Sequence, residues 1–457
     1  MTDSRTATPA VTRTAGRGGE PMRSVLVVDN SGRGHAFADL FVRTDPDVVV
    51  HYAPGCEAIE HDRIVSAPWL DLYDPDPAPM VRHALELGVD LVLVGHPRPL
   101  ANGYVDAFRA AGLAVIGPDR AAARLESSKV FTKDLCTKYG IATAGYRWFD
   151  APEPAVEHVR EVGAPVVVKC DYSCQGNGVF VCETVDEAVE AIERLMVARD
   201  FGPGGARVVI EDKLVGKEQL FFVLVSGEQY VMLPMAVDYP RSEDGNEGPM
   251  CGGMGAFCPH PEETPEVVDR FRRQMLEPLL AAVRAEGMDY TGVLYADCML
   301  VGDRLYLIEI NARMGDPEAE VVFPRITSDF TEVCAAVLER RLDRLPPLAL
   351  TDEYFVDVAA TQGPDGVHPG WPYGSVGRGH PVRGVADLDP ERCQVFYGGA
   401  RVMGDGALVT DGGKVLHLVG RGDTLEQAID HAYEGIAKIG FTGIRYRTDI
   451  GKVMPWE

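Results

Sequence analysis

The first hundred residues of the chain alternate between short apolar runs and longer mixed segments. Four apolar runs occupy residues 24–30, 48–50, 91–95 and 113–117. Helix-length segments such as 79–87 and 105–111 separate the later runs. A short apolar run that ends in turn-forming residues is typical of a buried parallel strand. Because such strands alternate with helices, the pattern predicts an N-terminal open parallel α/β domain over residues 23–120.

The middle of the chain has a different pattern, in which strands flank loops of small residues. Residues 165–169 and 178–182 predict two strands around a loop that contains glycine and small polar residues. Residues 208–214 and 290–300 predict further strands, and Gly302 with Asp303 marks a turn after the last of them. We expect one large central unit over residues 121–345, divided into 121–205 and 206–345.

The C-terminal part of the chain changes to short β runs that are separated by glycine-rich turns. A helix is predicted over residues 424–439, where Thr424 and Gln427 fit a capping box. These features predict a small α+β closing domain over residues 346–457. The fold class is therefore multidomain, with α/β and α+β parts, and the chain contains no heptads or internal repeat.

Composition restricts the partners of the protein. The formal net charge of the 457 residues is -25, which opposes binding to nucleic acid, because nucleic-acid sites need clustered Lys and Arg. No run approaches the ~20 apolar residues that a membrane helix requires.

Ten cysteines occur without a Cys-x-x-Cys pair, so we expect reduced thiols and a cytoplasmic location. Residues 1–22 lack the apolar region of a secretory signal; we expect a flexible tail, with Met1 or Met22 as the start.

The run Ile308–Glu318 carries the strongest chemical signal. Alternate side chains of a strand share a face, so Glu309 and Asn311 project together. A hairpin that turns at residue 303 sets Asp297 opposite Glu309. Like charges in this position are unfavourable unless a cation neutralises them, and Mg²⁺ binds carboxylates together with nucleotide phosphates. The run therefore predicts a metal site in an enzyme that uses ATP; a solvated acidic hairpin is the alternative.

Cationic residues near predicted loops indicate anion binding. Lys169 ends an apolar strand, where it must either extend to solvent or meet an anion. Lys129 follows Ser127 and Ser128, which are candidate helix caps. Arg33 and Arg98 lie in loops that follow strands and that can hold a phosphate through backbone N–H groups. For each of these loops a plain turn with a surface arginine is the alternative.

Taken in order, these segments resemble the glycinamide ribonucleotide synthetase (phosphoribosylamine-glycine ligase) family of the ATP-grasp superfamily. The resemblance covers about residues 23–457. Its most specific motifs occupy residues 126–133, 252–255, 290–294, 309–318 and 446–451. The resemblance implies that residues 121–345 form the ATP-grasp unit, with the phosphate flap in 121–205 and the catalytic Mg/ATP subdomain in 206–345.

The resemblance also implies a role for individual residues. ATP contacts would come from Lys129, Lys169, Gly176, Asn177, Gly178, Glu211, Leu214 and Glu218. The metal, Mg²⁺ with Mn²⁺ as an alternative, would be held by Asp297, Glu309 and Asn311. Arg313 and Asp316 would be catalytic, with Arg313 gripping the substrate carboxylate. Substrate contacts would come from Ser31, Gly32, Arg33, His35, Arg98, Asp238, Gly252, Gly253 and Glu318.

Family members join a small carboxylate to a small amine through an acyl phosphate and release ADP and phosphate. The resemblance therefore implies an amino acid, glycine or another, and an amine as substrates of a monomer or homodimer. The sequence departs from the family in the first loop (residues 29–36), in residues 95–100, in residues 237–241 and 248–253, and at residues 396–400. In the flap, Asn177 replaces a lysine.

Most of these departures fall in loops that would line the pocket of the amine. A site built to hydrogen-bond one substrate rejects analogues that lack its polar groups. We therefore expect a changed amine or acid substrate in a specialised pathway. The first alternative is the phosphoribosylamine-glycine reaction of purine biosynthesis itself. The second is a non-catalytic nucleotide-binding paralogue, which only Asn177 favours.

Overall fold

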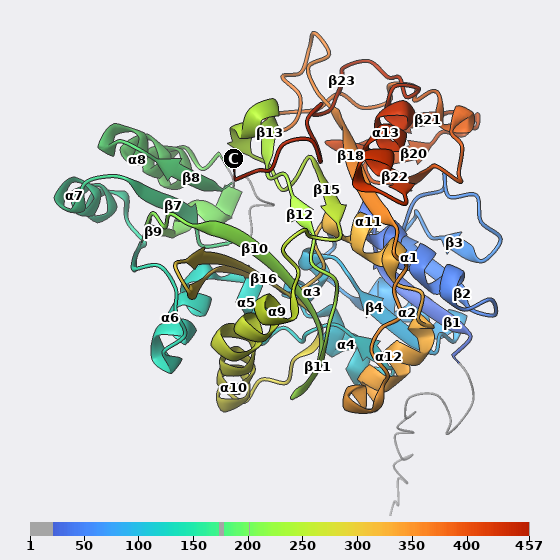
Figure 1. Cartoon of the computed structure of the whole chain (residues 1–457), viewed down its shortest axis with the longest axis horizontal. Helices are drawn as coiled ribbons and strands as arrows, with labels where there is room; N and C mark the ends of the chain where they lie inside the picture. Colours follow the sequence, from blue (N-terminus) through green and yellow to red (C-terminus); the bar gives the residue numbers. More distant parts are fainter. Residues whose placement is uncertain (1–21, 173–177, 201, 457) are drawn as a thin grey trace, which may run out of the picture.

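The computed structural model describes residues 22–172, 178–200 and 202–456 of the chain. Within these residues, four sheets of four or more strands build the molecule (Figure 1), and the strands of the third and fourth sheets are interleaved along the sequence. In the described part of the chain, no helix is long and apolar enough to cross a membrane. The arrangement is the multidomain α/β and α+β fold that the sequence predicts.

The first sheet is parallel, with strand order β3-β2-β1-β4-β5. Its strands are β1 (Ser24–Asp29), β2 (Val49–Pro54), β3 (Ile64–Ser66), β4 (Leu91–Val94) and β5 (Val115–Ile116). Helices α1 (Gly32–Thr44), α2 (Ala78–Leu87), α3 (Pro97–Asn102) and α4 (Tyr104–Ala110) connect them. Four of these five strands coincide with the predicted apolar runs. Because ligands of open parallel sheets bind beyond the carboxyl ends of the strands, the loop between β1 and α1 is placed for binding.

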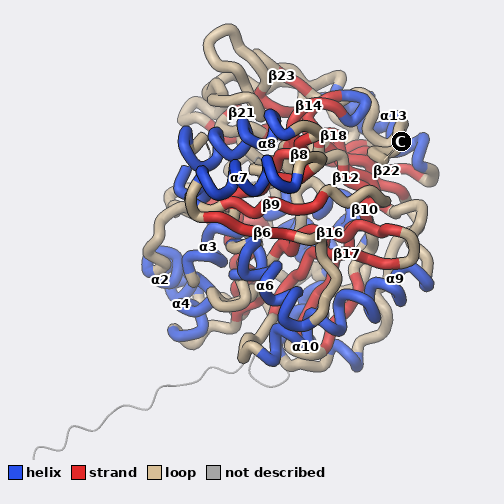
Figure 2. The backbone as a smooth tube through the Cα atoms, turned by 90° about the vertical axis from the view of Figure 1, so that its left-hand side faces the viewer, coloured by secondary structure: helices blue, strands red, loops and turns tan. Residues whose placement is uncertain are grey.

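The second sheet, of order β6-β9-β7-β8, carries its helices on one side, in front of the strands in Figure 2. Its strands are β6 (Tyr146–Phe149), β7 (Val166–Cys170), β8 (Val179–Cys182) and β9 (Val208–Asp212). The helices are α7 (Pro152–Val162) and α8 (Val185–Ile192). Two helices, α5 (Arg124–Ser127) and α6 (Lys129–Tyr139), connect this sheet to the first domain. Of the two candidate caps, Ser128 is the one that caps α6, by accepting a hydrogen bond from the Phe131 amide.

The third sheet is antiparallel, of order β11-β10-β16-β17. Its strands are β10 (Lys217–Ser226), β11 (Gln229–Met232), β16 (Thr291–Val301) and β17 (Arg304–Asn311), with helices α9 (Pro265–Phe271) and α10 (Glu277–Ala285) beside them. Strands β16 and β17 form the predicted hairpin around Gly302. Helices α11 (Glu318–Val322) and α12 (Phe330–Leu338) follow and pack on α1 of the first domain.

The fourth sheet, of order β12-β15-β18-β22-β19, joins two distant parts of the sequence. Strands β12 (Val237–Asp238) and β15 (Gly255–Cys258) precede the β16–β17 hairpin. Strands β18 (Tyr354–Gln362), β19 (Cys393–Tyr397), β22 (Lys414–Gly422) and β23 (Ile444–Arg445) come from the C-terminal part and carry α13 (Leu425–Ile436). Two small hairpins, β13 (Arg241–Glu243) with β14 (Glu247–Met250) and β20 (Ala400–Val402) with β21 (Leu408–Thr410), lie outside it. The segment around residue 250 is therefore held between the central and the closing parts of the molecule.

The cysteines differ from expectation at one position. Eight described cysteines, Cys56, Cys136, Cys182, Cys251, Cys258, Cys298, Cys334 and Cys393, are free thiols, and all are buried. Cys170 is disulfide-bonded. The expectation of uniformly reduced thiols is therefore wrong at Cys170, the last residue of β7.

Candidate active site

A cavity of about 1560 Å³ lies where the four sheets meet. Its lining includes Arg33 from α1, Lys169 from β7, Asp297 from β16 and Lys414 from β22. The cavity therefore brings together residues that are up to 387 positions apart in the sequence, from Asn30 to His417. Most of the charged side chains described below line this cavity.

Three carboxyl groups converge on one side of the cavity. Asp297 and Glu309 are directly paired across the β16–β17 hairpin, and Glu218 approaches Asp297 from β10. Burial, followed by the negative charges of Glu218 and Glu309, raises the pKa of Asp297 well above its usual range. One oxygen of Asp297, Oδ1, has no hydrogen-bond partner. The three groups therefore create a buried site that favours a cation.

The donors at this site fit Mg²⁺ or Mn²⁺. The amide of Asn311 lies beside Glu309, with Nδ2 donating to Oε1 at 3.3 Å. Carboxylate and amide oxygens are the ligands that hard divalent cations take, and the partnerless Asp297 oxygen shows that protein groups alone do not satisfy the set. Asp297, Glu309 and Asn311, the three expected metal ligands, thus lie together.

Lysines border the carboxyl groups. Lys129 Nζ lies 3.1 Å from Glu309 Oε2, and Lys129 and Lys169 lower the pKa of Glu309 to about 2 although burial alone would raise it. Lys169 Nζ and Lys133 Nζ both contact Glu211 Oε2, at 3.0 and 3.1 Å. The other oxygen of Glu211, Oε1, has no partner. Glu211 therefore holds two buried ammonium groups at the cavity.

Arg313 is fixed by residues on both sides. Its Nε donates to Glu126 Oε1 at 3.2 Å, and its Nη2 donates to Asn311 Oδ1 at 2.9 Å. Glu126 Oε2 also accepts from the Ala312 amide at 2.9 Å. The guanidinium is thus oriented by Glu126, from α5, and shares Asn311 with the candidate metal site. Sequence reasoning gave Glu126 no role.

Asp316 lies at the opposite end of the same loop, next to the closing part of the molecule. Lys414 Nζ donates to Asp316 Oδ1 at 2.7 Å and also to the Gly252 carbonyl oxygen at 2.7 Å. The pKa of Asp316 is well below its usual range because Lys414, His417 and Arg33 outweigh the effect of burial. Lys414 therefore ties Asp316 to residues 252–255, the glycine segment.

The glycine segment approaches two further carboxyl groups. Gly253 has φ +90°, and a Cβ there would lie 2.3 Å from Pro317 Cδ and 2.8 Å from Asp238 Oδ1. Asp238 Oδ1 is buried without a hydrogen-bond partner, and burial together with Glu318 raises the pKa of Asp238 well above its usual range. Asp238, Glu318 and Gly252 line the cavity. Gly253 supports the site by permitting close packing.

The N-terminal residues divide into two groups. Ser31 and Arg33 line the cavity, and Arg33 Nε is bound to Asp29 Oδ2 at 2.9 Å. His35 and Arg98 do not line it. His35 Nδ1 accepts from the Tyr397 amide at 3.1 Å, and its ring stacks on Tyr397, while Arg98 is exposed and lies over the Tyr73 ring.

The remaining expected site residues are placed as follows. Leu214, Glu218 and Gly178 line the cavity. Gly32 packs on Glu320, whose Oε1 would lie 2.3 Å from a Cβ at this position. Gly176 and Asn177 lie outside the described residues. The sequence pointed to no role for Lys133, Lys414 or His417; Lys133 lies one turn from Lys129 on α6, a spacing that could have indicated it.

Three family models match consecutive parts of the chain. Residues 23–126 match the N domain of phosphoribosylglycinamide synthetase, residues 127–319 its ATP-grasp (A) domain, and residues 367–453 its C domain. The chain is 37% identical over 430 residues to the phosphoribosylamine–glycine ligase of Vibrio cholerae, covering 93% of this chain and 97% of that protein. It is 38% identical over 429 residues to the Streptococcus suis protein of the same name, with coverage of 93% and 98%.

Solved structures give the same result. The phosphoribosylamine–glycine ligase of Thermotoga maritima superposes with a TM-score of 0.79 at 29% identity, covering 93% of this chain and 99% of that one. The biotin carboxylase domain of Hydrogenobacter thermophilus 2-oxoglutarate carboxylase, in a complex with MgADP and bicarbonate, superposes with a TM-score of 0.69 at 16% identity, covering 93% and 92%. The latter shares the fold.

Proposed function

The chain belongs to the phosphoribosylglycinamide synthetase family, and we propose that it is an ADP-forming ATP-grasp ligase that joins glycine to phosphoribosylamine. The observation that carries this proposal is the single cavity in which Asp297, Glu309 and Asn311 adjoin Arg313. The relatives support the phosphoribosylamine–glycine reaction, which the sequence analysis kept as its alternative. Nothing in the relatives favours a changed substrate.

The nucleotide would lie between the second and third sheets. Lys129 and Lys169 would contact its phosphates, and the adenosine part would lie near Glu211, Leu214 and Glu218. A divalent cation, Mg²⁺ or Mn²⁺, would be held by Asp297, Glu309 and Asn311. This cation would neutralise negative charge on the phosphates. Lys129 would then contact phosphate oxygens in place of Glu309.

Arg313 would hold the carboxylate of glycine. A guanidinium binds a carboxylate through two parallel hydrogen bonds, and Glu126 fixes the orientation of this one. One carboxylate oxygen attacks the γ-phosphorus, and the bond between the γ-phosphorus and the β–γ bridging oxygen breaks. ADP leaves and an acyl phosphate remains. Alignment of the two reacting groups and electrostatic stabilisation of the phosphoryl oxygens would supply the rate enhancement, because phosphoryl transfer needs little covalent help.

The amine would then approach from the side of the first sheet and the glycine segment. Its nitrogen attacks the acyl carbon, the bond from this carbon to the phosphate oxygen breaks, and inorganic phosphate leaves. The nitrogen must lose a proton, and Asp238 Oδ1 is a buried oxygen without a partner in this part of the cavity. Ser31 and Arg33 lie at the same end, where they would contact the phosphate group of the amine.

The test is ADP release by the full chain with ATP, Mg²⁺, glycine and freshly prepared phosphoribosylamine, compared with a panel of other amino acids and amines. We expect release that requires both glycine and phosphoribosylamine. Release with another pair alone would favour the changed substrate, and no release with any pair would favour a nucleotide-binding protein. The control is Glu309→Ala, which should keep the fold at lower stability but lose Mg²⁺-dependent turnover.

A further inference from the structure

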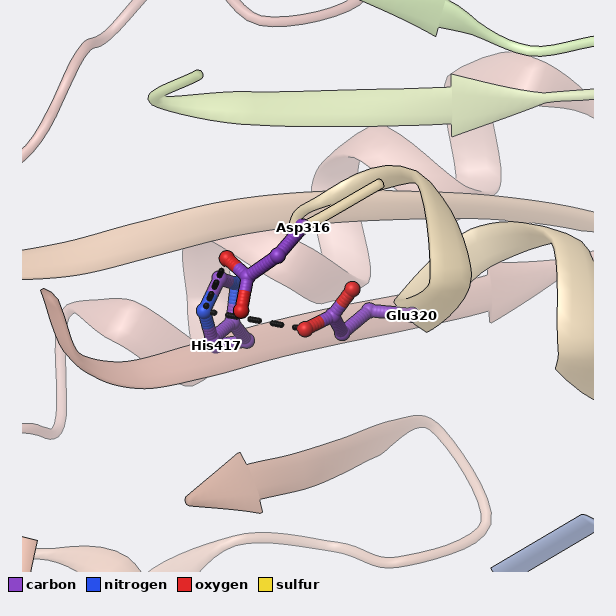
Figure 3. Close-up of side chains that lie close together, drawn as sticks. All are labelled: Asp316, Glu320 and His417. Carbon is purple, nitrogen blue, oxygen red and sulfur yellow. Dashed lines mark ion pairs between the residues drawn. The ribbon is translucent and has the colours of Figure 1, made fainter. Parts of the chain in front are cut away.

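Two buried side chains at the closing side of the cavity, Glu320 and His417, hold polar atoms that lack hydrogen-bond partners, and the partly buried Asp316 lies beside them. Glu320 of α11 and His417 of β22 have no exposed surface, and Asp316 adjoins both (Figure 3). Neither oxygen of Glu320 has a hydrogen-bond partner, and neither does Nε2 of His417. A buried carboxylate without a donor or cation is costly. Glu320 has an ion-pair contact with the His417 imidazole at 3.8 Å but no hydrogen-bond donor, so the cluster can accept a further cation.

The distances between these atoms are longer than those of ordinary hydrogen bonds and suit a shared cation. His417 Nε2 lies 3.4 Å from Asp316 Oδ1 and 3.8 Å from Glu320 Oε1. Ligands at about 2.0–2.2 Å from a tetrahedral metal are separated by about 3.3–3.6 Å. The carboxylate and imidazole atoms of the three residues all lie within 4.8 Å of one another. Small adjustments would bring the three atoms onto one metal ion.

The opposite nitrogen of the imidazole has the partner that a metal ligand needs. His417 Nδ1 lies 2.7 Å from Asp357 Oδ2, inside β18 and fully buried. A metal-binding histidine commonly donates its second N–H to a carboxylate, which fixes the ring and leaves the first nitrogen free for the metal. Asp357 thus orients Nε2 toward Asp316 and Glu320.

The neighbouring charges leave room for a cation. Lys414 contacts Asp316 Oδ1, and the Arg33 amide approaches Asp316 Oδ2 at 3.5 Å. Lys414 also donates to two backbone oxygens, those of Gly252 and Asp316. Lys414 would therefore still have two hydrogen-bond acceptors if a metal bound the Asp316 carboxylate. Neither group is bonded to Glu320. His417 and Asp316 line the cavity, which gives an ion access.

We propose that Asp316, Glu320 and His417 form a second metal site, distinct from the one at Asp297 and Glu309, for a divalent transition metal of the Zn²⁺ class. One imidazole with two carboxylates suits such metals, whereas Mg²⁺ prefers oxygen ligands alone. The ion would join α11 to β22 and so fix the Asp316 loop against the closing part of the molecule. This proposal does not depend on the proposed function.

Another group, formed by Asp365, His368 and His380, provides a control. Asp365 Oδ2 lies 2.9 Å from His368 Nδ1 and 3.1 Å from His380 Nε2. These contacts are direct hydrogen bonds, and Asp365 Oδ1 also accepts from two backbone amides. Because its atoms are already paired, this group does not require a metal.

The experiment uses Co²⁺ as a coloured substitute, added to the full chain in excess Mg²⁺, which occupies the oxygen-only site. We expect one Co²⁺ per chain to remain after desalting, with ligand-field bands and no thiolate charge-transfer band. His417→Asn keeps a donor toward Asp357 but removes Nε2, and Glu320→Gln keeps the shape but removes the charge. Both substitutions should weaken the binding of Co²⁺ more than about 100-fold. Asp357→Asn should weaken the binding of Co²⁺ about 10–100-fold.

His380→Asn and Glu309→Gln should bind Co²⁺ as the unaltered protein does. Loss of Co²⁺ in His380→Asn, or full retention in Glu320→Gln, would overturn the proposal. If a variant does not fold, X-ray absorption of the Co²⁺-loaded unaltered protein decides, because the site predicts one imidazole with oxygen ligands. Two imidazoles, a sulfur ligand or no bound Co²⁺ would exclude it.

Discussion

Asp297 and Glu309 lie directly opposite each other in the β16–β17 hairpin, yet only Glu309 has a cationic partner, Lys129 at 3.1 Å. The two carboxyls therefore differ in what they contribute without a metal. Asp297 is buried with a partnerless oxygen, and such a group costs about 1–3 kcal/mol of stability. Glu309 instead stabilises the metal-free protein through its ion pair.

The first prediction follows from this difference. Without metal, Asp297→Asn should unfold at the same temperature as the unaltered protein or higher, whereas Glu309→Gln should lose about 1–3 kcal/mol because Lys129 loses its counter-charge. Both variants should lose the additional stabilisation that Mg²⁺ gives in the presence of ADP. Thermal unfolding with and without MgADP measures both effects. A clear loss of metal-free stability in Asp297→Asn would contradict the assignment.

The second prediction concerns Glu211, which contacts the ammonium groups of both Lys133 and Lys169. All three side chains are 4% exposed. Removing one partner of a buried pair leaves an uncompensated charge and costs about 3–5 kcal/mol. We therefore expect Glu211→Gln to lower the free energy of unfolding by this amount, as measured by urea denaturation.

The matched control for Glu211 is Glu183→Gln, because Glu183 pairs with Lys213 on the surface and is 59% exposed. Exposed ion pairs contribute at most about 1 kcal/mol. Equal effects of the two substitutions would mean that the Glu211 cluster is open to water.

The third prediction tests the close packing of the glycine segment. In Gly253→Ala, the new Cβ would meet Pro317 and Asp238, and the residue would keep φ +90°. Left-handed strain and overpacking each cost about 1–3 kcal/mol. Gly245→Ala is the control, since Gly245 has φ +70° with no atom within 4 Å of a Cβ. Gly253→Ala should be the less stable variant and also the less active one; equal stability would show that the segment relaxes freely.

The fourth prediction concerns pH and His35. Burial, with a smaller effect of His61, lowers the pKa of His35 to about 3 from its usual 6.5. Between these values the unfolded chain binds a proton that the folded chain does not, so folding becomes less favourable as pH falls from about 6.5 towards 3. Above pH 6.5 this effect is absent. His35→Asn keeps an acceptor for the Tyr397 amide but cannot titrate.

Urea denaturation of both proteins at pH 7.5 and pH 5 measures the effect. The loss of stability between the two pH values should be smaller in His35→Asn than in the unaltered protein. His96 and His260, whose pKa values burial lowers to about 4, should retain part of the loss. An identical pH dependence of the two proteins would show that His35 is protonated when folded.

The sequence predicted local geometry well. The alternation of β17 and the turn near Gly302 predicted that Asp297 lies opposite Glu309, which is confirmed, but the turn alone does not produce this pairing. Val301 pairs with Arg304, and a register shift between Asp297 and Cys298, which the sequence did not predict, brings Asp297 opposite Glu309. The cap Thr424 was predicted and Ser128 was one of two candidates, since a cap depends on residues within three positions. The fold class followed from the order of such local signals.

Long-range contacts could not be predicted from these signals. His35 was expected at the substrate, but its partner Tyr397 is 362 residues away and comes from β19 of the fourth sheet. Glu126 and Arg313 are 187 residues apart, and nothing near Glu126 indicates that its carboxylate faces Arg313. Which of two polar residues in a loop reaches the cavity depends on packing between domains, and local patterns carry no information on this.

The last prediction concerns Arg313 and its support by Glu126. Arg313→Lys replaces a planar group with a point charge and loses both the contact with Glu126 and the two-point grip on the substrate carboxylate. Glu126→Gln retains an acceptor for the Ala312 amide but loses the charge that orients the guanidinium. Since displacement of a catalytic group by about 1 Å can cost about 100-fold, we expect each variant to lower kcat/KM for glycine by about 100-fold or more. The KM for ATP should change little, because neither residue contacts Lys169 or Glu211. A large rise in the KM for ATP alone would instead place Arg313 at the nucleotide.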